Sequence, residues 1–229
     1  MAQASAVEHH PTSTGTDNRK LLWWIFLGSE CLFFGSLLAT YLIFKGSLAI
    51  PPFPTDRIVD AAALVGVSDA AREACHSIGN NLFECEGILD VPVTSQSTFV
   101  LLMSSVTMVL AVYGAQNNRL KMMKLWLLAT MLLGLAFLGY QVFEFTTFGN
   151  EGLNLSSNQF GASFFMLTGF HGTHVAVGVL YLGSLLFASF RRSGLGPEAG
   201  FHIESAGLYW HFVDVVWIVL FTVLYLIPA

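Results

Sequence analysis

Charged residues are scarce in this chain. Asp, Glu, Lys and Arg make up 11% of its 229 residues, whereas a soluble globular domain has roughly 25%. Hydrophobic residues account for 54% of the chain. The ten basic residues form no cluster of the kind that binds nucleic acid. The composition therefore excludes a soluble domain and a nucleic-acid partner, and it indicates an integral membrane protein.

Cysteine is also rare, with three residues in the whole chain. Cys31 lies in an apolar run and is expected to act as a small hydrophobic side chain. Cys75 and Cys85 lie in a polar segment and could form a disulfide if that segment faces an oxidising compartment. Covalent haem attachment is excluded, because Arg72 stands where a Cys-x-x-Cys-His motif would need its first cysteine.

Long apolar runs are abundant, and a helix needs about 20 apolar residues to cross a bilayer. We therefore predict an all-α fold, an integral membrane bundle of five transmembrane helices. A flexible cytoplasmic arm at 1–20 precedes a membrane domain at 21–229, which includes an outer loop at 45–97. The predicted spans are 21–44, 99–115, 125–145, 160–190 and 206–227.

The basic residues predict the orientation of the bundle. Five spans place the two termini on opposite sides of the membrane. Cytoplasmic segments usually carry the excess of Lys and Arg, so we expect the N-terminus in the cytoplasm and the C-terminus outside. That arrangement leaves only Lys45, Arg57 and Arg72 outside and places seven basic residues inside: Arg19, Lys20, Arg119, Lys121, Lys124, Arg191 and Arg192.

Several ionisable residues lie inside the predicted spans, where a charge costs roughly 2.5 to 3.5 kcal/mol. His211 and Asp214, in Tyr-Trp-His-Phe-Val-Asp-Val-Val-Trp at 209–217, share one helix face because they are spaced i, i+3. We expect them to be paired polar anchors. Glu30, near the middle of the first span, is expected to be protonated or hydrogen-bonded, as a buried structural carboxyl or as a proton-handling or lipid-contacting group.

The histidines leave a metal or haem site open as an alternative. A bis-histidine haem would need one ligand from each of two helices, such as His171 or His174 with His211. The same pair at 171 and 174 is equally typical of a polar seam packed on a neighbouring helix. No Cys or Met accompanies the histidines at a spacing that suits copper or zinc.

Four motifs resemble those of subunit III of the haem-copper terminal oxidases, in its five-helix bacterial form. The longest is the stretch at 209–217, which follows Glu204. The others read Gly-Phe-His-Gly-Thr-His-Val at 169–175, Ser-Glu-Cys-Leu-Phe-Phe at 29–34 and Gln-Val-Phe-Glu-Phe at 141–145. The resemblance covers all five spans.

The resemblance implies an accessory, non-catalytic subunit in a bacterial inner membrane. Haem and copper would belong to partner subunits, including catalytic subunit I, and this chain would bind phospholipid and support proton uptake during oxygen reduction. Glu30 matches the buried carboxyl of the family, with a proton or lipid contact, and Arg191 matches a position that meets a lipid phosphate. The resemblance assigns structural or interface roles to His171, His174, Glu204, Trp210, His211 and Asp214.

Other interpretations remain open at this level. A stand-alone proton or ion transporter would use the buried ionisable residues as a relay, although the chain shows no internal repeat. A haem-bearing membrane anchor is the second rival. The loop at 45–97, which holds seven acidic residues, is either a solvated insertion or a surface for a basic partner such as a cytochrome c. The electron donor of the parent enzyme, cytochrome c or quinol, is undecided.

Overall fold

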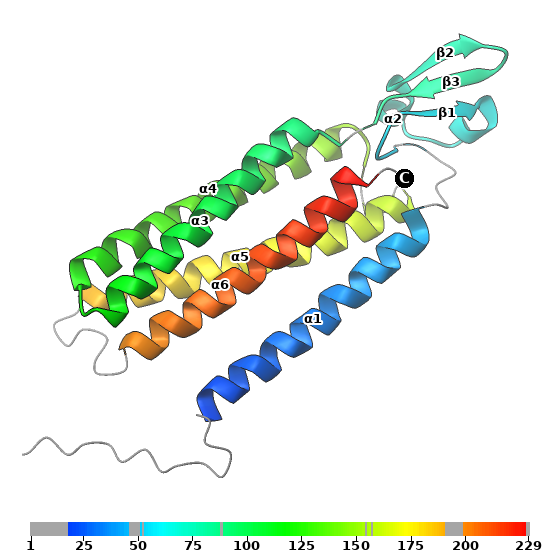
Figure 1. Ribbon diagram of the computed structural model, residues 1–229. Coiled ribbons are helices and arrows are strands. Elements are labelled where there is room, and N and C mark those ends of the chain that lie inside the picture. Colours follow the sequence, from blue (N-terminus) through cyan, green and yellow to red (C-terminus); the bar gives the residue numbers. More distant parts are fainter. Residues whose placement is uncertain are drawn as a thin grey trace, which may run out of the picture.

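Five long helices form the body of the protein (Figure 1). The computed structural model describes residues 18–45, 51, 53–87, 89–153, 155–156, 158–190 and 199–227. Each helix is long and apolar enough to cross a membrane, which confirms the five predicted spans. The helices are α1 (Asn18–Lys45), α3 (Val91–Gln116), α4 (Leu120–Asn150), α5 (Gln159–Phe190) and α6 (Ala199–Phe221), and α6 continues into a π-helical segment, η2 (Thr222–Leu226).

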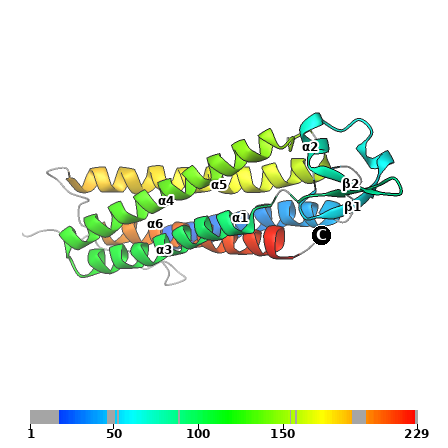
Figure 2. The same ribbon diagram turned by 90° about the horizontal axis from the view of Figure 1, so that it is seen from above.

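The helices pack unequally. α3 and α4 form the closest pair, and α6 packs on α3, α5 and α1. In Figure 2, α5 lies above α1, α3 and α6, and α4 runs obliquely from one layer to the other. α1 lies at the margin of the bundle and contacts α5 more than α6. Its outward face carries exposed apolar side chains, which suits contact with lipid or another membrane subunit: Leu22, Trp24, Ile25, Leu32 and Ile43.

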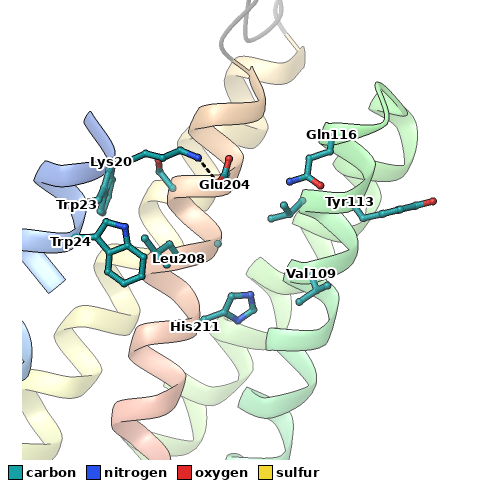
Figure 3. Close-up of a pocket in the computed structure, with 12 residues that line it drawn as sticks. Lys20, Trp23, Trp24, Val109, Tyr113, Gln116, Glu204, Leu208 and His211 are labelled. Atoms are coloured by element: carbon teal, nitrogen blue, oxygen red, sulfur yellow. Dashed lines mark hydrogen bonds and ion pairs between the residues drawn. The ribbon is translucent and has the colours of Figure 1, made fainter. Parts of the chain in front are cut away.

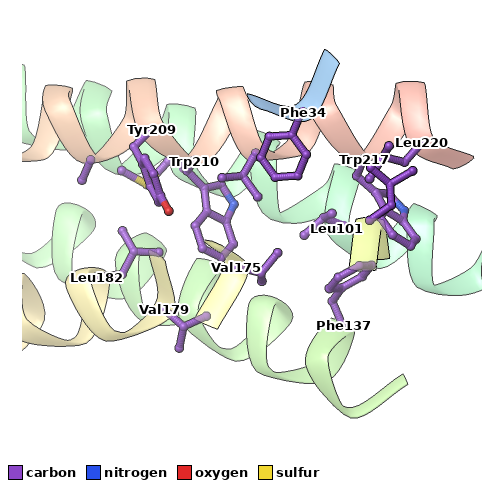
Figure 4. Packing of buried hydrophobic residues seen from close by; sticks show 14 of the residues in the cluster. Phe34, Leu101, Phe137, Val175, Val179, Leu182, Tyr209, Trp210, Trp217 and Leu220 are labelled. Atoms are coloured by element: carbon purple, nitrogen blue, oxygen red, sulfur yellow. The ribbon is translucent and has the colours of Figure 1, made fainter. Parts of the chain in front are cut away.

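Trp210 is a centre of the core (Figure 4). Its indole is 1% exposed and packs between α4 and α5 at two glycines. A Cβ atom on Gly134 would lie 2.6 Å from Trp210 Cη2, and one on Gly178 would lie 2.9 Å from Trp210 Cζ3. Small residues at these positions let the ring fill the space between the helices, as they commonly do in membrane bundles.

A small subdomain lies beyond one end of the bundle and departs from the all-α prediction (Figure 1). It contains β1 (Arg57–Asp60), η1 (Ala61–Leu64), α2 (Asp69–Glu73), β2 (Cys75–Gly79) and β3 (Leu82–Cys85). The strands form an antiparallel sheet in the order β1-β3-β2. Strands this short carry almost no periodic signal, so the sequence indicated only a polar loop.

Two local features shape the subdomain. Asn80 and Asn81 have φ of 55° and 61° in the tight turn between β2 and β3, a conformation that asparagine tolerates better than most residues. Cys75 and Cys85 lie opposite each other in the ladder and form a disulfide. The segment is also shorter than the predicted loop, because Asp90 caps α3 through Val93 N at 3.3 Å and starts the helix at Val91.

Candidate functional site

An ion pair or hydrogen bond joins α1 to α5 inside the bundle. Glu30 Oε2 lies 3.1 Å from His174 Nε2, and both side chains are 18% exposed. The other ring nitrogen of His174, Nδ1, lies 2.8 Å from the carbonyl oxygen of Phe170. The structure thus brings together two of the predicted site residues, from helices far apart in the sequence.

The hydrogen bonds of His174 determine how many protons this pair holds. A carbonyl oxygen only accepts, so Nδ1 must carry a proton and donate it to Phe170. Nε2 then either accepts a hydrogen bond from the neutral acid of Glu30 or, as part of an imidazolium, donates one to its carboxylate. Both arrangements hold the same number of protons and have zero net charge, which suits a position within an apolar helix bundle.

A pocket of about 620 Å³ opens beside the Glu30–His174 pair. Its walls come from α1, α5 and α6 and are mostly aromatic or apolar. Tyr209 contributes a ring to the wall, and its hydroxyl donates to the carbonyl oxygen of His174 at 3.0 Å. The volume lies in the range of small-molecule and lipid-chain sites. The pocket places the polar pair where an apolar ligand would meet it.

The stretch at 209–217 connects α6 to α3 through hydrogen bonds of its tryptophans. Trp210 Nε1 donates to Ser104 Oγ at 2.9 Å, and Trp217 Nε1 donates to Thr98 Oγ1 at 2.9 Å. Each bond satisfies a buried indole N–H, which would otherwise be costly. Two tryptophans seven residues apart on α6 therefore meet hydroxyls at matching heights on α3.

His211 and Asp214 are not paired with each other, contrary to the prediction. His211 Nδ1 lies 2.6 Å from Ser105 Oγ, again on α3. Asp214 is 4% exposed, and neither of its carboxyl oxygens has a hydrogen-bond partner among the described residues. The i, i+3 spacing places the two side chains on one face of α6, but only His211 meets a hydroxyl of α3.

His171 is fully buried between α5 and α6. Its Nε2 lies 3.2 Å from the carbonyl oxygen of Val213. Its ring packs on Trp217 and Phe137, with centroid distances of 4.8 Å and 5.8 Å. These contacts place the ring among aromatic side chains of the core, and its Nδ1 has no hydrogen-bond partner among the described residues.

A second pocket, of about 490 Å³, lies at the end of the bundle where α1 and α6 begin (Figure 3). Lys20 Nζ and Glu204 Oε1 form an ion pair across it at 3.0 Å, with side chains 52% and 48% exposed. Trp23 and Trp24 of α1 and Val109 and Tyr113 of α3 line the walls, and His211 lines it deeper between the helices.

The sequence missed the partners of several predicted residues. Lys20 was considered only as a basic residue that predicts the orientation. The α3 hydroxyls of Thr98, Ser104 and Ser105 were not singled out, although hydroxyl residues recur along 94–107 within an otherwise apolar run. Arg191, predicted to meet a lipid phosphate, lies outside the described residues. In the part of the chain that the structure describes, no group of three or more His, Cys, Asp or Glu could hold a metal ion.

A five-helix bundle joined by a His, Asp and Trp motif on its last span is consistent with one family of membrane subunits, and comparison with known proteins supports it. The family model for cytochrome c oxidase subunit III matches residues 78–228. The chain is 35% identical to cytochrome c oxidase subunit 3 of Bacillus sp. (strain PS3), over 97% of this chain and 91% of that protein. It is 34% identical to quinol oxidase subunit 3 of Bacillus subtilis (strain 168), over 97% of this chain and 93% of that protein.

The chain belongs to the cytochrome c oxidase subunit III family. It is a multi-pass membrane protein with bacterial homologues. The similarity to subunits of cytochrome c oxidases and of quinol oxidases is nearly equal. Family membership therefore leaves the electron donor of the parent enzyme undecided.

Proposed function

We propose that this chain is an accessory subunit of a haem-copper terminal oxidase that stabilises the catalytic subunit, binds phospholipid and supports proton uptake. Haem and copper belong to the partner subunits in this proposal. The observation that carries it is the Glu30–His174 pair, which lies beside a pocket with mostly apolar walls. A lipid chain would fill such a pocket, and a shared proton beside it could move between two groups without creating a net charge.

The proposed orientation places the start of α1 in the cytoplasm. Arg19 and Lys20 lie at the end of the bundle where α1 begins, and the turn between α3 and α4 lies at that same end with Arg119. The outer subdomain lies at the opposite end. The positive-inside rule then places the disulfide in the extracytoplasmic space, where disulfides persist.

Two variants of Glu30 test the proposal in the assembled oxidase. Glu30→Gln keeps a side chain that reaches His174, so assembly and bound lipid should remain as in the wild type. Glu30→Ala leaves Nε2 of His174 without its partner and enlarges the pocket, so it should lose lipid on purification or slow proton uptake. Lipid content is measured by mass spectrometry, and proton uptake by a pH-indicator dye during turnover. Equal lipid content and proton uptake in both variants would refute the role of Glu30.

Purification separates the proposed function from its rivals. An accessory subunit should co-purify with a large haem-copper subunit, and the isolated chain should be colourless. A haem-bearing anchor would show a haem absorption band in the isolated chain. A stand-alone transporter would purify alone and move ions in vesicles, and either result would overturn the proposal.

A further inference from the structure

The pocket at the start of α1 and α6 opens on the side of the bundle that a membrane would surround (Figure 3). α6 forms its floor, and α1 and α3 stand on either side of that floor. Trp24 of α1 and Val109 and Tyr113 of α3, which line the two walls, are each about half exposed or more. A molecule dissolved in the lipid phase therefore meets this pocket directly, without passing through water.

His211 supplies a hydrogen-bonding group on the floor of the pocket. Its Nδ1 lies 2.6 Å from Ser105 Oγ, while Nε2, on the other edge of the ring, makes no hydrogen bond to the described residues. His211 follows Glu204 by seven residues, so it lies about 10 Å farther along the helix axis. A ring nitrogen at that depth gains from a polar partner, because an unpaired polar group in an apolar medium is costly.

The contact between Ser105 and His211 lets Nε2 act as a donor or as an acceptor. When the Ser105 hydroxyl donates to Nδ1, the imidazole proton is on Nε2, which then donates to a carbonyl oxygen. When Nδ1 carries the proton and donates to Ser105, Nε2 accepts from a hydroxyl. Both states are neutral. The pair therefore suits a ligand whose oxygen is a carbonyl in one redox state and a hydroxyl in the other.

The rest of the lining favours a neutral ligand with a flat ring. Lys20 and Glu204 neutralise each other in an ion pair of 3.0 Å, so this end of the pocket has no unpaired charge to attract a phosphate. An acyl chain on the floor would leave Nε2 of His211 without a partner. Trp24 and Tyr113 instead offer aromatic rings on opposite walls, and such rings pack well against another ring.

We infer that this pocket binds an isoprenoid quinone or quinol of the membrane, with one ring oxygen on Nε2 of His211 and the chain directed out into the lipid. The volume of about 490 Å³ lies in the range of small-molecule sites. Binding involves no electron transfer, because the ligand enters and leaves in the redox state that it has in the membrane. The site lies on the other side of α1 from the Glu30–His174 pair, so it does not depend on the role proposed for Glu30.

Photo-crosslinking in the assembled oxidase tests the site. The probe is an azido-naphthoquinone with a decyl chain, and mass spectrometry identifies the labelled peptides. The wild type should carry label on α1 and α3, and an excess of the quinone without the azide should suppress it. His211→Phe keeps a ring but loses the hydrogen bond, so labelling of this chain should fall about tenfold, within the range for a lost partner in a buried site. His76→Phe, the same exchange in the small subdomain, is the matched control and should leave labelling unchanged.

Filling the pocket gives a second test that keeps His211 in place. Leu208 lines the floor, so Leu208→Trp should abolish the label on this chain. Absence of label from the wild-type chain, or equal labelling of the wild type and either pocket variant, would overturn the quinone site. Suppression by an excess of phosphatidylethanolamine as strong as that by the quinone would also overturn it, because the pocket would then hold acyl chains without regard to the ring.

Discussion

Lys20 and Glu204 join the beginnings of α1 and α6 by an ion pair of 3.0 Å. At the other end of α1, Lys45 Nζ donates to the carbonyl oxygen of Val223 at 2.9 Å, in the π-helical end of the last span. Lysines at both ends of α1 thus fasten it to the last span. Between them, pockets lie on two sides of the first half of α1, and Trp23 lines both. α1 is therefore joined to the last span at both ends and to α5 near its middle through Glu30 and His174.

The ion pair at the start of α1 should position this helix rather than stabilise the fold. Both side chains are half exposed, and such pairs contribute about 0 to 1 kcal/mol. Lys20→Glu should therefore change the melting temperature little but increase the distance between spin labels placed at the starts of α1 and α6. The double exchange Lys20→Glu with Glu204→Lys should restore the wild-type distance. If the label distance in the double variant were as long as in the single variant, the ion pair would not determine the position of α1.

The glycines around Trp210 should tolerate no larger side chain. A Cβ on Gly134 or Gly178 would lie within 3 Å of the indole, so Gly134→Ala should overpack the core and cost about 1 to 3 kcal/mol. Gly139 lies on the same helix, and a methyl group there would meet nothing within 4 Å, so Gly139→Ala is the control and should be neutral. Chemical denaturation of the detergent-solubilised chain measures both, and equal effects would contradict the packing argument.

The Cys75–Cys85 disulfide should stabilise the small subdomain alone. The two residues are ten apart in the chain, and closing a short loop of this kind typically contributes about 2 to 3 kcal/mol. The double variant Cys75→Ser with Cys85→Ser should be cleaved faster by protease between β1 and α3, while the helices stay protected. Cys31→Ser, in α1, is the control. Unchanged cleavage in the double variant would show that strand pairing suffices.

Acidity should affect stability through Glu151, which follows α4. Partial burial, and then the negative charge of Asp90, raise the pKa of the Glu151 carboxyl above its ordinary value. A raised pKa in the folded state means that folding disfavours the ionised carboxylate. Below the pKa of Glu151 in the unfolded state, the group does not affect the free energy of unfolding. As the pH rises through its pKa in the folded state, the group lowers that free energy. Glu151→Gln should therefore raise the melting temperature at neutral pH and leave it unchanged below the ordinary pKa of glutamate. A gain of the same size at both values would assign the effect to something other than ionisation.

Shortening the small subdomain tests whether its acidic residues attract a basic partner. Removal of residues 57–86, with a short flexible link in their place, should reduce the oxidase turnover with a cytochrome donor at low salt if the surface docks it, because exposed charges act over about 10 Å at 0.1 M salt and farther below that. Measurements at low and high ionic strength separate docking from misfolding. Unchanged turnover at low salt would leave the segment as a solvated insertion.

Local hydrophobicity determined most of the fold. Five apolar runs of sufficient length predicted five helices, because in a bilayer the backbone must satisfy its own hydrogen bonds and the helix does so within one segment. Each helix begins before its predicted run, since polar residues at the start, such as Asn18 and Gln159, belong to the helix outside the apolar region. The motifs at 169–175 and 209–217 also predicted the family correctly, because they are carried by residue identity alone.

The tertiary structure decided which polar groups meet. The sequence placed His211 and Asp214 on one face of α6, but Ser105, more than a hundred residues earlier, is the partner of His211. Such a pairing depends on the rotation and height at which α3 packs against α6. Contacts such as that of Trp210 Nε1 with Ser104 Oγ fix both, and they exist only in the folded bundle. The sheet and its disulfide were also decided by the tertiary structure, because the local sequence pattern of a strand does not specify which residues it pairs with.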